Sequence, residues 1–172
     1  MLCLWDLDTH ARLASAVIND KAVDTGERRG RQSTMSSCAP NQCARTADWG
    51  PAGTIAIGLN SGHVRILNAE DLSTVAEVQV TERPISVVKF DPTGDFLAVG
   101  AHDSQAYILS TADLSRVSKC TGNSSWISHI DWDETGMAIQ TNSGAYELLF
   151  YTAETYVEDA AVALLLRTWG GG

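Results

Sequence analysis

The chain has 172 residues, enough for a domain with a sizeable buried core, and its 44% hydrophobic and 19% charged content is that of an ordinary globular protein. Its formal net charge of −9 leaves no basic footprint, so nucleic acid is not an expected partner. The longest apolar run, residues 160–166, is far shorter than the roughly 20 residues of a membrane-spanning helix, so no membrane partner is expected either.

The first predicted element is a strand over residues 2–7, which contains the pair Trp5-Asp6 and resembles the later segment 64–69. Residues 20–42 follow; they are rich in Ser, Arg, Gly and Asp and poor in apolar side chains. That composition is typical of a solvated loop, so we predict a polar insertion there.

Two units of four short antiparallel strands are predicted next, over residues 43–84 and 85–125. The expected strands are 43–49, 54–59, 63–68 and 74–80 in the first unit, and 85–90, 96–100, 106–110 and 116–120 in the second. Their turns use residues suited to reversing the chain, as in 91–94, where Pro stands second and Gly fourth.

A third unit is predicted over residues 126–172, with an irregular C-terminal part. Strands are expected at 126–132, 137–141 and 145–151, with the hairpin turn at 142–144. Residues 160–166 are compatible with an outer strand and equally with a short helix.

The three units share an aromatic residue followed by a turn that ends in glycine. The aromatics Trp49, Phe90 and Trp132 are 41 and 42 residues apart. Repeats of about 40–45 residues with four strands each indicate WD40 propeller blades. We therefore predict an all-β WD40-type β-propeller segment with two complete four-stranded blades, one nearly complete blade and one half blade, residues 1–19 being the end of a preceding blade. Because propellers usually have 4–8 blades, we expect a piece of a longer protein.

Three strings go beyond a generic WD repeat: residues 96–103, 120–132 and 140–151. They resemble the echinoderm microtubule-associated protein-like family, and the similarity runs over roughly residues 44–151. The resemblance implies a place in the second of two fused propellers of a cytoplasmic, microtubule-associated protein. It also implies that tubulin contact depends mainly on the other propeller and on an N-terminal coiled-coil and basic region.

Nothing in the residue pattern favours an enzyme, and no catalytic, cofactor-binding or metal-binding residues are expected. His102 and Asp103 stand together, but in a predicted turn, where an aspartate commonly binds the turn's backbone. His129 is expected to be buried and hydrogen-bonded, and it can share a strand face with Asp131. The four cysteines (Cys3, Cys38, Cys43 and Cys120) are scattered, as in reduced thiols that fill space.

Protein contacts are the more plausible use of the exposed positions. The interface candidates at the start of the third unit are Asn123, Ser125, Trp126 and His129. Arg28, Arg29 and Arg31 lie in the insertion, as a solubilising loop or as a hook for an acidic surface such as the tubulin tails. Trp49 and Trp132 share the repeat position of Phe90, so we expect both in the blade core.

The sequence thus predicts a non-enzymatic WD-repeat scaffold of a microtubule-associated protein, whose blades display loops for protein contacts. The alternative is a general WD40 interaction scaffold, for example a subunit of a ubiquitin ligase or of a ciliary complex.

Overall fold

A computed structural model describes residues 2–5, 8–9, 11–16, 43–50 and 53–152. Within these residues every regular element is a β-strand. The strands are β1 Leu2–Trp5, β2 Arg12–Ala16, β3 Ala44–Trp49, β4 Thr54–Leu59, β5 His63–Asn68, β6 Thr74–Gln79, β7 Ile85–Phe90, β8 Phe96–Ala101, β9 Ala106–Ser110, β10 Arg116–Cys120, β11 Ile127–Trp132, β12 Ala138–Ser143 and β13 Leu148–Thr152.

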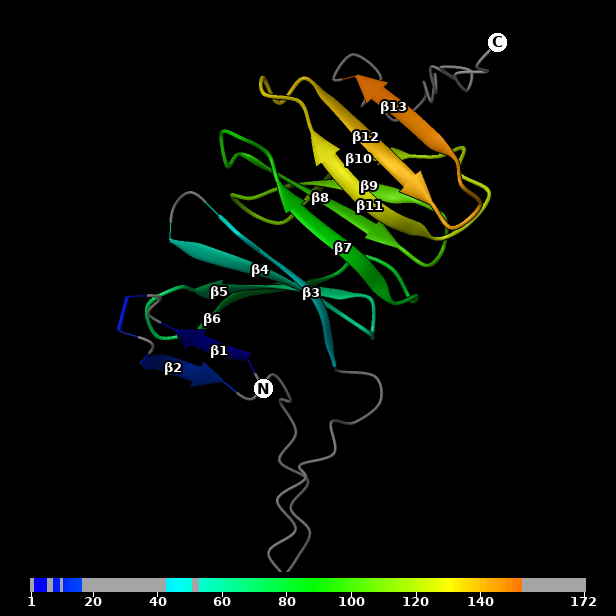
Figure 1. Cartoon of the computed structure of the whole chain (residues 1–172). Helices are drawn as coiled ribbons and strands as arrows, with labels where there is room; N and C mark the ends of the chain where they lie inside the picture. The colour runs from blue at the N-terminus through cyan, green and yellow to red at the C-terminus, as the bar shows by residue number, and fades with distance from the viewer. Residues whose placement is uncertain (1, 6–7, 10, 17–42, 51–52, 153–172) are drawn as a thin grey trace, which may run out of the picture.

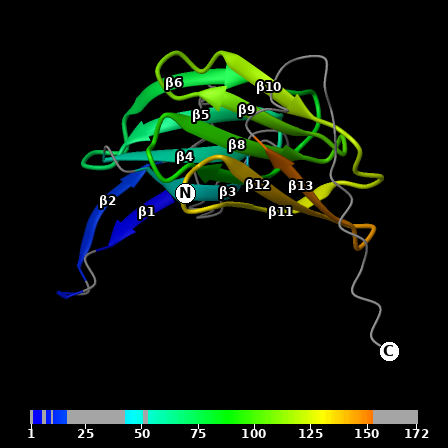
Figure 2. The same ribbon diagram turned by 90° about the horizontal axis from the view of Figure 1, so that it is seen from above.

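The strands form four antiparallel sheets that follow one another along the chain (Figure 1). Two sheets have four strands each, in the orders β3-β4-β5-β6 and β7-β8-β9-β10; one has three, β11-β12-β13; and one has two, β1-β2. Seen from above, the inner strands β3 and β11 lie on one side and the outer strands β6 and β10 on the opposite side (Figure 2). The predicted all-β propeller segment is therefore confirmed.

The middle strands of the two four-stranded sheets are buried on both faces because a neighbouring sheet lies on each side, whereas β12 of the three-stranded sheet is buried only at alternate residues. β4 and β8 are apolar and almost wholly buried, which suits a strand packed on two sides. The outer strand β6 alternates between exposed and half-buried residues, as expected at a sheet edge. Position within the blade, more than strand propensity, thus sets the composition of each strand.

The core consists of side chains between neighbouring sheets. Between the two four-stranded sheets it includes Val88, Phe90 and Leu97, with Val99 and Leu109. A second cluster joins the sheets β7–β10 and β11–β13 through Ile108, Ile127, Ile130, Ile139 and Tyr151. A third cluster, with Ile57, Leu59 and Leu67, lies on the other face of the sheet β3–β6, and Ala14 of β2 packs against it. The first two clusters therefore each need side chains from two neighbouring sheets.

Polar groups also join the inner strands of neighbouring blades. The Asp48 carboxylate accepts from the Phe90 backbone N–H at 2.8 Å and pairs with the Lys89 ammonium at 3.2 Å. The Trp132 indole N–H donates to the Lys89 carbonyl at 3.0 Å, and the Ser86 hydroxyl donates to the Ile127 carbonyl. These bonds fix how β3, β7 and β11 lie beside one another.

The repeat position shared by Trp49, Phe90 and Trp132 does not give equal burial. Phe90 is buried and Trp132 packs against the second cluster, but Trp49 is 57% exposed, so its predicted core role is wrong. Phe90 packs against the sheet β3–β6, whereas the sheet that precedes β3 has only β1 and β2. No described inner strand covers Trp49.

The hairpin turn of the third blade was also predicted at the wrong residues. β12 runs on to Ser143, and the turn occupies the residues before Leu148, with Tyr146 in the left-handed conformation at φ 62°. Tyr146 occupies the position that Gly62 and Ser104 occupy in the corresponding turns of the other two blades, and all three residues have positive φ. The predicted insertion over 20–42 and the open alternative over 160–166 lie outside the described residues.

Candidate protein-interaction surface

Trp126 is an exposed aromatic held on the backbone just before β11. Its side chain is 42% exposed, and its ring stacks on His102 with centroids 5.1 Å apart and planes 27° apart. The Trp126 carbonyl accepts from the Gly144 N–H at 2.9 Å. A Cβ on Gly144 would lie 2.4 Å from the indole nitrogen, so the missing side chain at this position lets the indole lie over the turn. The Trp126 ring is thus held in place by His102 and by the turn at Gly144, which come from different parts of the sequence.

Tyr146 lies in the same turn as Gly144 and is fully exposed. A tyrosine in the left-handed region is strained, and such strain is concentrated at functional sites. Sequence reasoning missed Tyr146 because Gly144, two residues earlier, is the residue type expected at the left-handed position of a hairpin turn. The register of the repeat could have identified it, because Tyr146 occupies the position that Gly62 and Ser104 hold in the other two blades. We call Trp126, His102, Gly144 and Tyr146 the Trp126 edge.

The loop before Trp126 is held by buried hydrogen bonds. Asn123 is only 8% exposed; its amide donates to the Tyr151 hydroxyl at 3.1 Å, and its carbonyl oxygen accepts from the Thr141 hydroxyl at 3.3 Å. The Tyr151 hydroxyl donates to the Thr121 carbonyl at 3.0 Å, and burial raises the pKa of Tyr151 to about 12. Asn123 therefore supports the loop from within and offers no surface to a partner.

Glu147 binds this loop to the hairpin turn. Its carboxylate accepts from the Ser124 backbone N–H at 2.8 Å, from the Ser124 hydroxyl, and from the Ser143 hydroxyl at 2.7 Å. The bond from the Ser124 side chain is the main reason that the pKa of Glu147 is lowered. Ser125, between this carboxylate clamp and Trp126, is half-buried.

His129 and Asp131 pair on the face of β11, with the His129 Nε2 2.8 Å from a carboxylate oxygen of Asp131. Both side chains are more than half exposed, so the expected burial of His129 is wrong. The side chain at the same register as His129 in the preceding blade, Val87, packs in the cluster shared with the sheet β11–β13, whereas no described sheet covers this face of β11. The structure does not bring His129 into the Trp126–His102 stack.

The neighbouring turn confirms the predicted structural role of Asp103. Its carboxylate accepts from the Gln105 backbone N–H at 3.1 Å and from the hydroxyls of Thr81 and Tyr107, each at 2.7 Å. Burial, and then the bond to Asp103, raises the pKa of Tyr107 to about 12. Thr81 comes from the preceding blade, so Asp103 also joins two blades.

His102 contributes its ring to the stack, and its Nε2 is buried without a hydrogen-bond partner in the described part of the chain. Burial, followed by the charge of Arg45, lowers the pKa of His102. As the pH falls, the unfolded chain therefore binds a proton at His102 near pH 6.5, whereas the folded chain binds it only at a lower pH. The His102 contribution to stability is present above about pH 6.5 and is lost as the pH falls through the folded-state value.

We expect the free energy of unfolding to fall as the pH drops below about 6.5, with a smaller fall in His102→Gln, because glutamine does not titrate. Urea unfolding followed by tryptophan fluorescence at several pH values measures this. His63→Gln is the matched control, on the same edge of the preceding blade but outside the stack. Equal pH slopes for the native chain and His102→Gln would contradict the expectation.

The remaining candidates give no second site in the described residues. No group of three or more His, Cys, Asp or Glu side chains there could hold a metal ion, and none of the described segments is a helix that could cross a membrane. Cys3, Cys43 and Cys120 form no disulfide within the described residues, and burial raises the pKa of Cys120 to about 12. Cys38 and the three arginines of the insertion, Arg28, Arg29 and Arg31, lie outside the described residues.

The second β-propeller of the echinoderm microtubule-associated proteins matches the chain over residues 1–167. The chain belongs to this family. The match extends on both sides of the 44–151 region that carried the sequence resemblance, and it agrees with the four consecutive sheets. The Trp126 edge is therefore part of a WD-repeat propeller of this family.

A curated relative of this propeller segment is the ciliary WD repeat-containing protein ctxp80 of Euplotoides octocarinatus. It is 32% identical, and the alignment covers 96% of this chain and 24% of the relative. The chain thus spans about a quarter of that protein's length. A WD-repeat scaffold is the role that the family and this relative support together.

Proposed function

We propose that this propeller segment is a non-enzymatic scaffold of a cytoplasmic, microtubule-associated protein and that it contacts partner proteins through the Trp126 edge. The family match supports the microtubule setting, and tubulin is the proposed partner of the full-length parent. The parent's other regions supply most of the tubulin contact in this proposal, and this segment adds to it.

The observation that carries the proposal is the rigid, exposed indole of Trp126. Tryptophan and tyrosine are enriched among the few residues that dominate protein–protein affinity. An indole already stacked on His102 and seated over Gly144 loses little conformational freedom on binding, which favours affinity. Ser125 precedes it in the chain, and exposed Tyr146 lies two residues from Gly144 in the same hairpin turn, while His129 lies farther along β11 as a separate contact candidate.

Microtubule co-sedimentation of the full-length parent tests the proposal. We expect the parent to pellet with microtubules and the present chain alone to stay in the supernatant. Trp126→Ala in the parent should weaken binding about tenfold or more, since loss of a hot-spot aromatic costs about 2 kcal/mol.

If Arg28, Arg29 and Arg31 contribute as a hook, deletion of residues 20–42 should remove a component of binding that fades above roughly 0.15 M salt.

Val117→Ala is the control variant, because Val117 is an exposed apolar residue of the outer strand β10 that takes no part in the Trp126 edge. A parent that fails to pellet would refute the microtubule setting. A parent that pellets equally well with Trp126→Ala would refute the role of this edge.

The second candidate, a subunit of a ciliary complex, is favoured by the ciliary relative. Immunofluorescence of the parent in ciliated cells distinguishes the two. Signal confined to cilia supports the ciliary complex, whereas signal along cytoplasmic microtubules supports the first proposal. No observation favours the ubiquitin-ligase alternative.

A further inference from the structure

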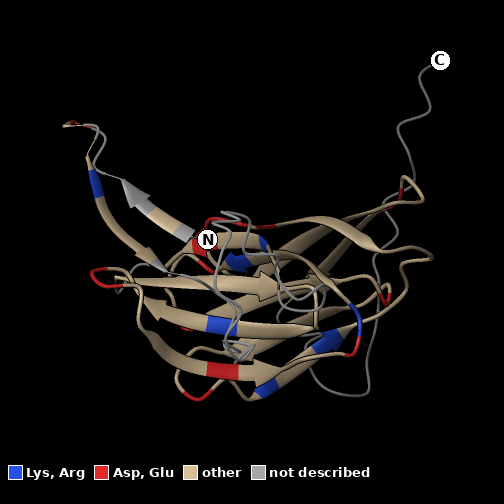
Figure 3. Ribbon diagram, turned by 90° about the horizontal axis from the view of Figure 1, so that it is seen from below, with Lys and Arg blue, Asp and Glu red and all other residues tan. Residues whose placement is uncertain are grey.

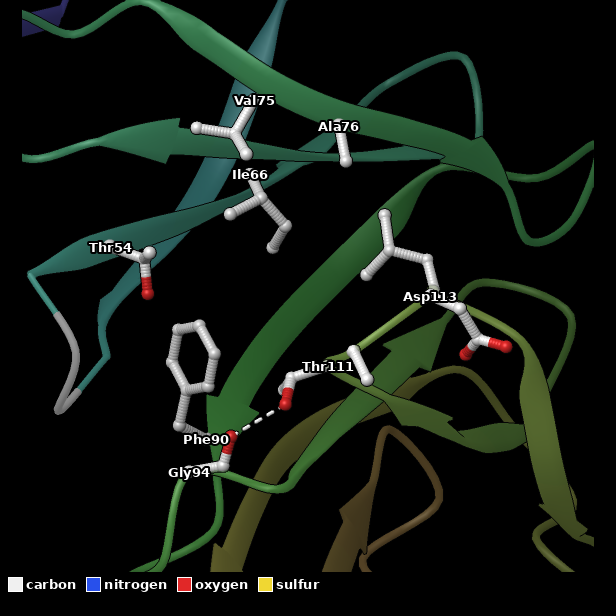
Figure 4. A pocket seen from close by; sticks show the side chains of 10 residues that line it. Thr54, Ile66, Val75, Ala76, Phe90, Gly94, Thr111 and Asp113 are labelled. Atoms are coloured by element: carbon white, nitrogen blue, oxygen red, sulfur yellow. Dashed lines mark hydrogen bonds between the residues drawn. The ribbon is translucent and has the colours of Figure 1, made fainter.

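A pocket of about 260 Å³ opens between the first two complete blades, away from the Trp126 edge (Figure 4). Its apolar walls are Ile66, Val75 and Ala76 from one blade and Phe90 and Leu114 from the next. Val75 is 63% exposed, so the mouth is open to solvent. The volume is below the roughly 300–1,000 Å³ of small-molecule pockets, which suits a single inserted side chain better than a whole ligand.

A small residue, Thr54, lines the pocket at one position of the blade repeat. By sheet register, Thr54 in β4 corresponds to Phe96 in β8: each is the first strand residue, and they pair with Asn68 and Ser110. A benzyl group at the Thr54 position would extend into the space that the threonine leaves open. The following blade, with phenylalanine there, shows that the fold accepts the larger residue.

The lip of the pocket is negatively charged. Asp113 lines it directly, and its pKa is lowered by the side-chain and backbone hydrogen bonds of Ser115, so it is ionised at neutral pH. Exposed Asp95 lies beside the pocket, because its carbonyl accepts from the backbone N–H of the lining residue Thr111 at 3.0 Å. No described lysine or arginine forms an ion pair with either carboxylate.

The same edge of the sheets carries further acidic turns. Asp and Glu fall mainly in turns and Lys and Arg mainly in strands (Figure 3). Arg116 begins β10 near this edge, but it lines a neighbouring hollow with Val78 and Val80 and is not among the residues that line the pocket. The charge at the lip therefore complements a basic partner.

We propose that this pocket docks a basic segment of a partner protein, which inserts one aliphatic or aromatic side chain between Val75 and Phe90 and places a lysine or arginine beside Asp113. This site goes beyond the scaffold function proposed above, because the partner is basic whereas the tubulin tails are acidic. It also uses none of the residues of the Trp126 edge.

Fluorescence anisotropy with defined peptides tests the pocket on the full chain. The probe is a short labelled peptide with a central phenylalanine between pairs of lysines, and the comparison peptide has glutamates in their place. We expect saturable binding of the lysine peptide only. Thr54→Phe should weaken it at least tenfold by filling the pocket, and Asp113→Asn should weaken it up to about fivefold, the range of an exposed ion pair.

Asp133→Asn is the matched control, since Asp133 occupies a similar hydrogen-bonded turn on the same edge but belongs to the third blade. It should leave peptide binding unchanged, and thermal melting checks that each variant is folded. Unchanged binding by folded Thr54→Phe would overturn the proposal, as would equal binding of the glutamate peptide or no saturable binding at about millimolar peptide. Concentration-dependent self-association abolished by Thr54→Phe would assign the pocket to a second copy of the chain and would equally overturn it.

Discussion

Leu97→Ala is expected to lower the free energy of unfolding by about 2–5 kcal/mol, the range for a leucine removed from a core that cannot collapse around the cavity. Leu97 is completely buried in β8 and belongs to the cluster between the two four-stranded sheets. That cluster holds two blades together, so its loss should affect the whole chain. Because folded domains are stable by only about 5–15 kcal/mol, the effect should be easy to measure.

Chemical denaturation followed by circular dichroism measures this change. Val75→Ala removes apolar atoms from an exposed position and should alter stability by less than about 0.5 kcal/mol. A Leu97→Ala chain as stable as the Val75→Ala chain would show that the two sheets do not depend on their shared core.

Asp103→Ala is expected to destabilise the chain by about 2–3 kcal/mol. The carboxylate is the acceptor for the hydroxyls of Thr81 and Tyr107, and its removal leaves both donors without this partner in a half-buried place. Hydrogen bonds to charged groups contribute about 1.5–3 kcal/mol, and an unsatisfied buried donor costs a similar amount. Since Thr81 belongs to the preceding blade, the loss also weakens the contact between blades.

A double-mutant cycle with Tyr107→Phe separates this network from general damage to the turn. If the hydroxyl of Tyr107 depends on Asp103, the two changes together should cost less than the sum of the single changes. Asp133→Ala, at an exposed turn, is the control and should cost clearly less. Strict additivity of Asp103→Ala and Tyr107→Phe would contradict the proposed coupling.

The two ends of the strands have different chemistry, and this difference organises both proposals. One end carries the Trp126 edge, and beside it the carboxylates of Asp103 and Glu147 accept from hydroxyls and backbone N–H groups. At the other end the exposed Asp113 and Asp95 lie beside an apolar pocket, and Asp113 also accepts from the N–H and the hydroxyl of Ser115. A scaffold with two such surfaces can hold two chemically different partners at once, which is testable because the two sets of variants share no residue.

Much of the fold follows from local patterns in the sequence. An aromatic residue, a turn ending in glycine and a short apolar run recur together at a nearly constant interval. Together they predict a strand, a turn and a second strand from neighbouring residues alone. The strands β3 to β10 therefore lie close to their predicted positions. The third blade was less predictable, because Gly144 suggested a turn two residues too early while the left-handed position is filled by Tyr146.

The candidate surface could be predicted only in part. Trp126 lies at the head of an inner strand, as its place in the repeat indicated, and it is exposed. Its stacking on His102 was not predictable, because the two residues come from different blades. Asn123 was an equally good candidate by composition, yet Tyr151 and Thr141 enclose it. The pocket beside Thr54 likewise depends on residues of two sheets and has no motif.

The sequence by itself determined the strand order, the repeating four-stranded unit and the non-basic character of the chain, because these depend on residue spacing and composition. The tertiary structure decided which of several equivalent positions is buried. Phe90 and Trp49 share one place in the repeat, yet only Phe90 meets a complete neighbouring sheet. Burial depends on what another sheet places opposite a residue, and those partners are dozens of residues away along the chain.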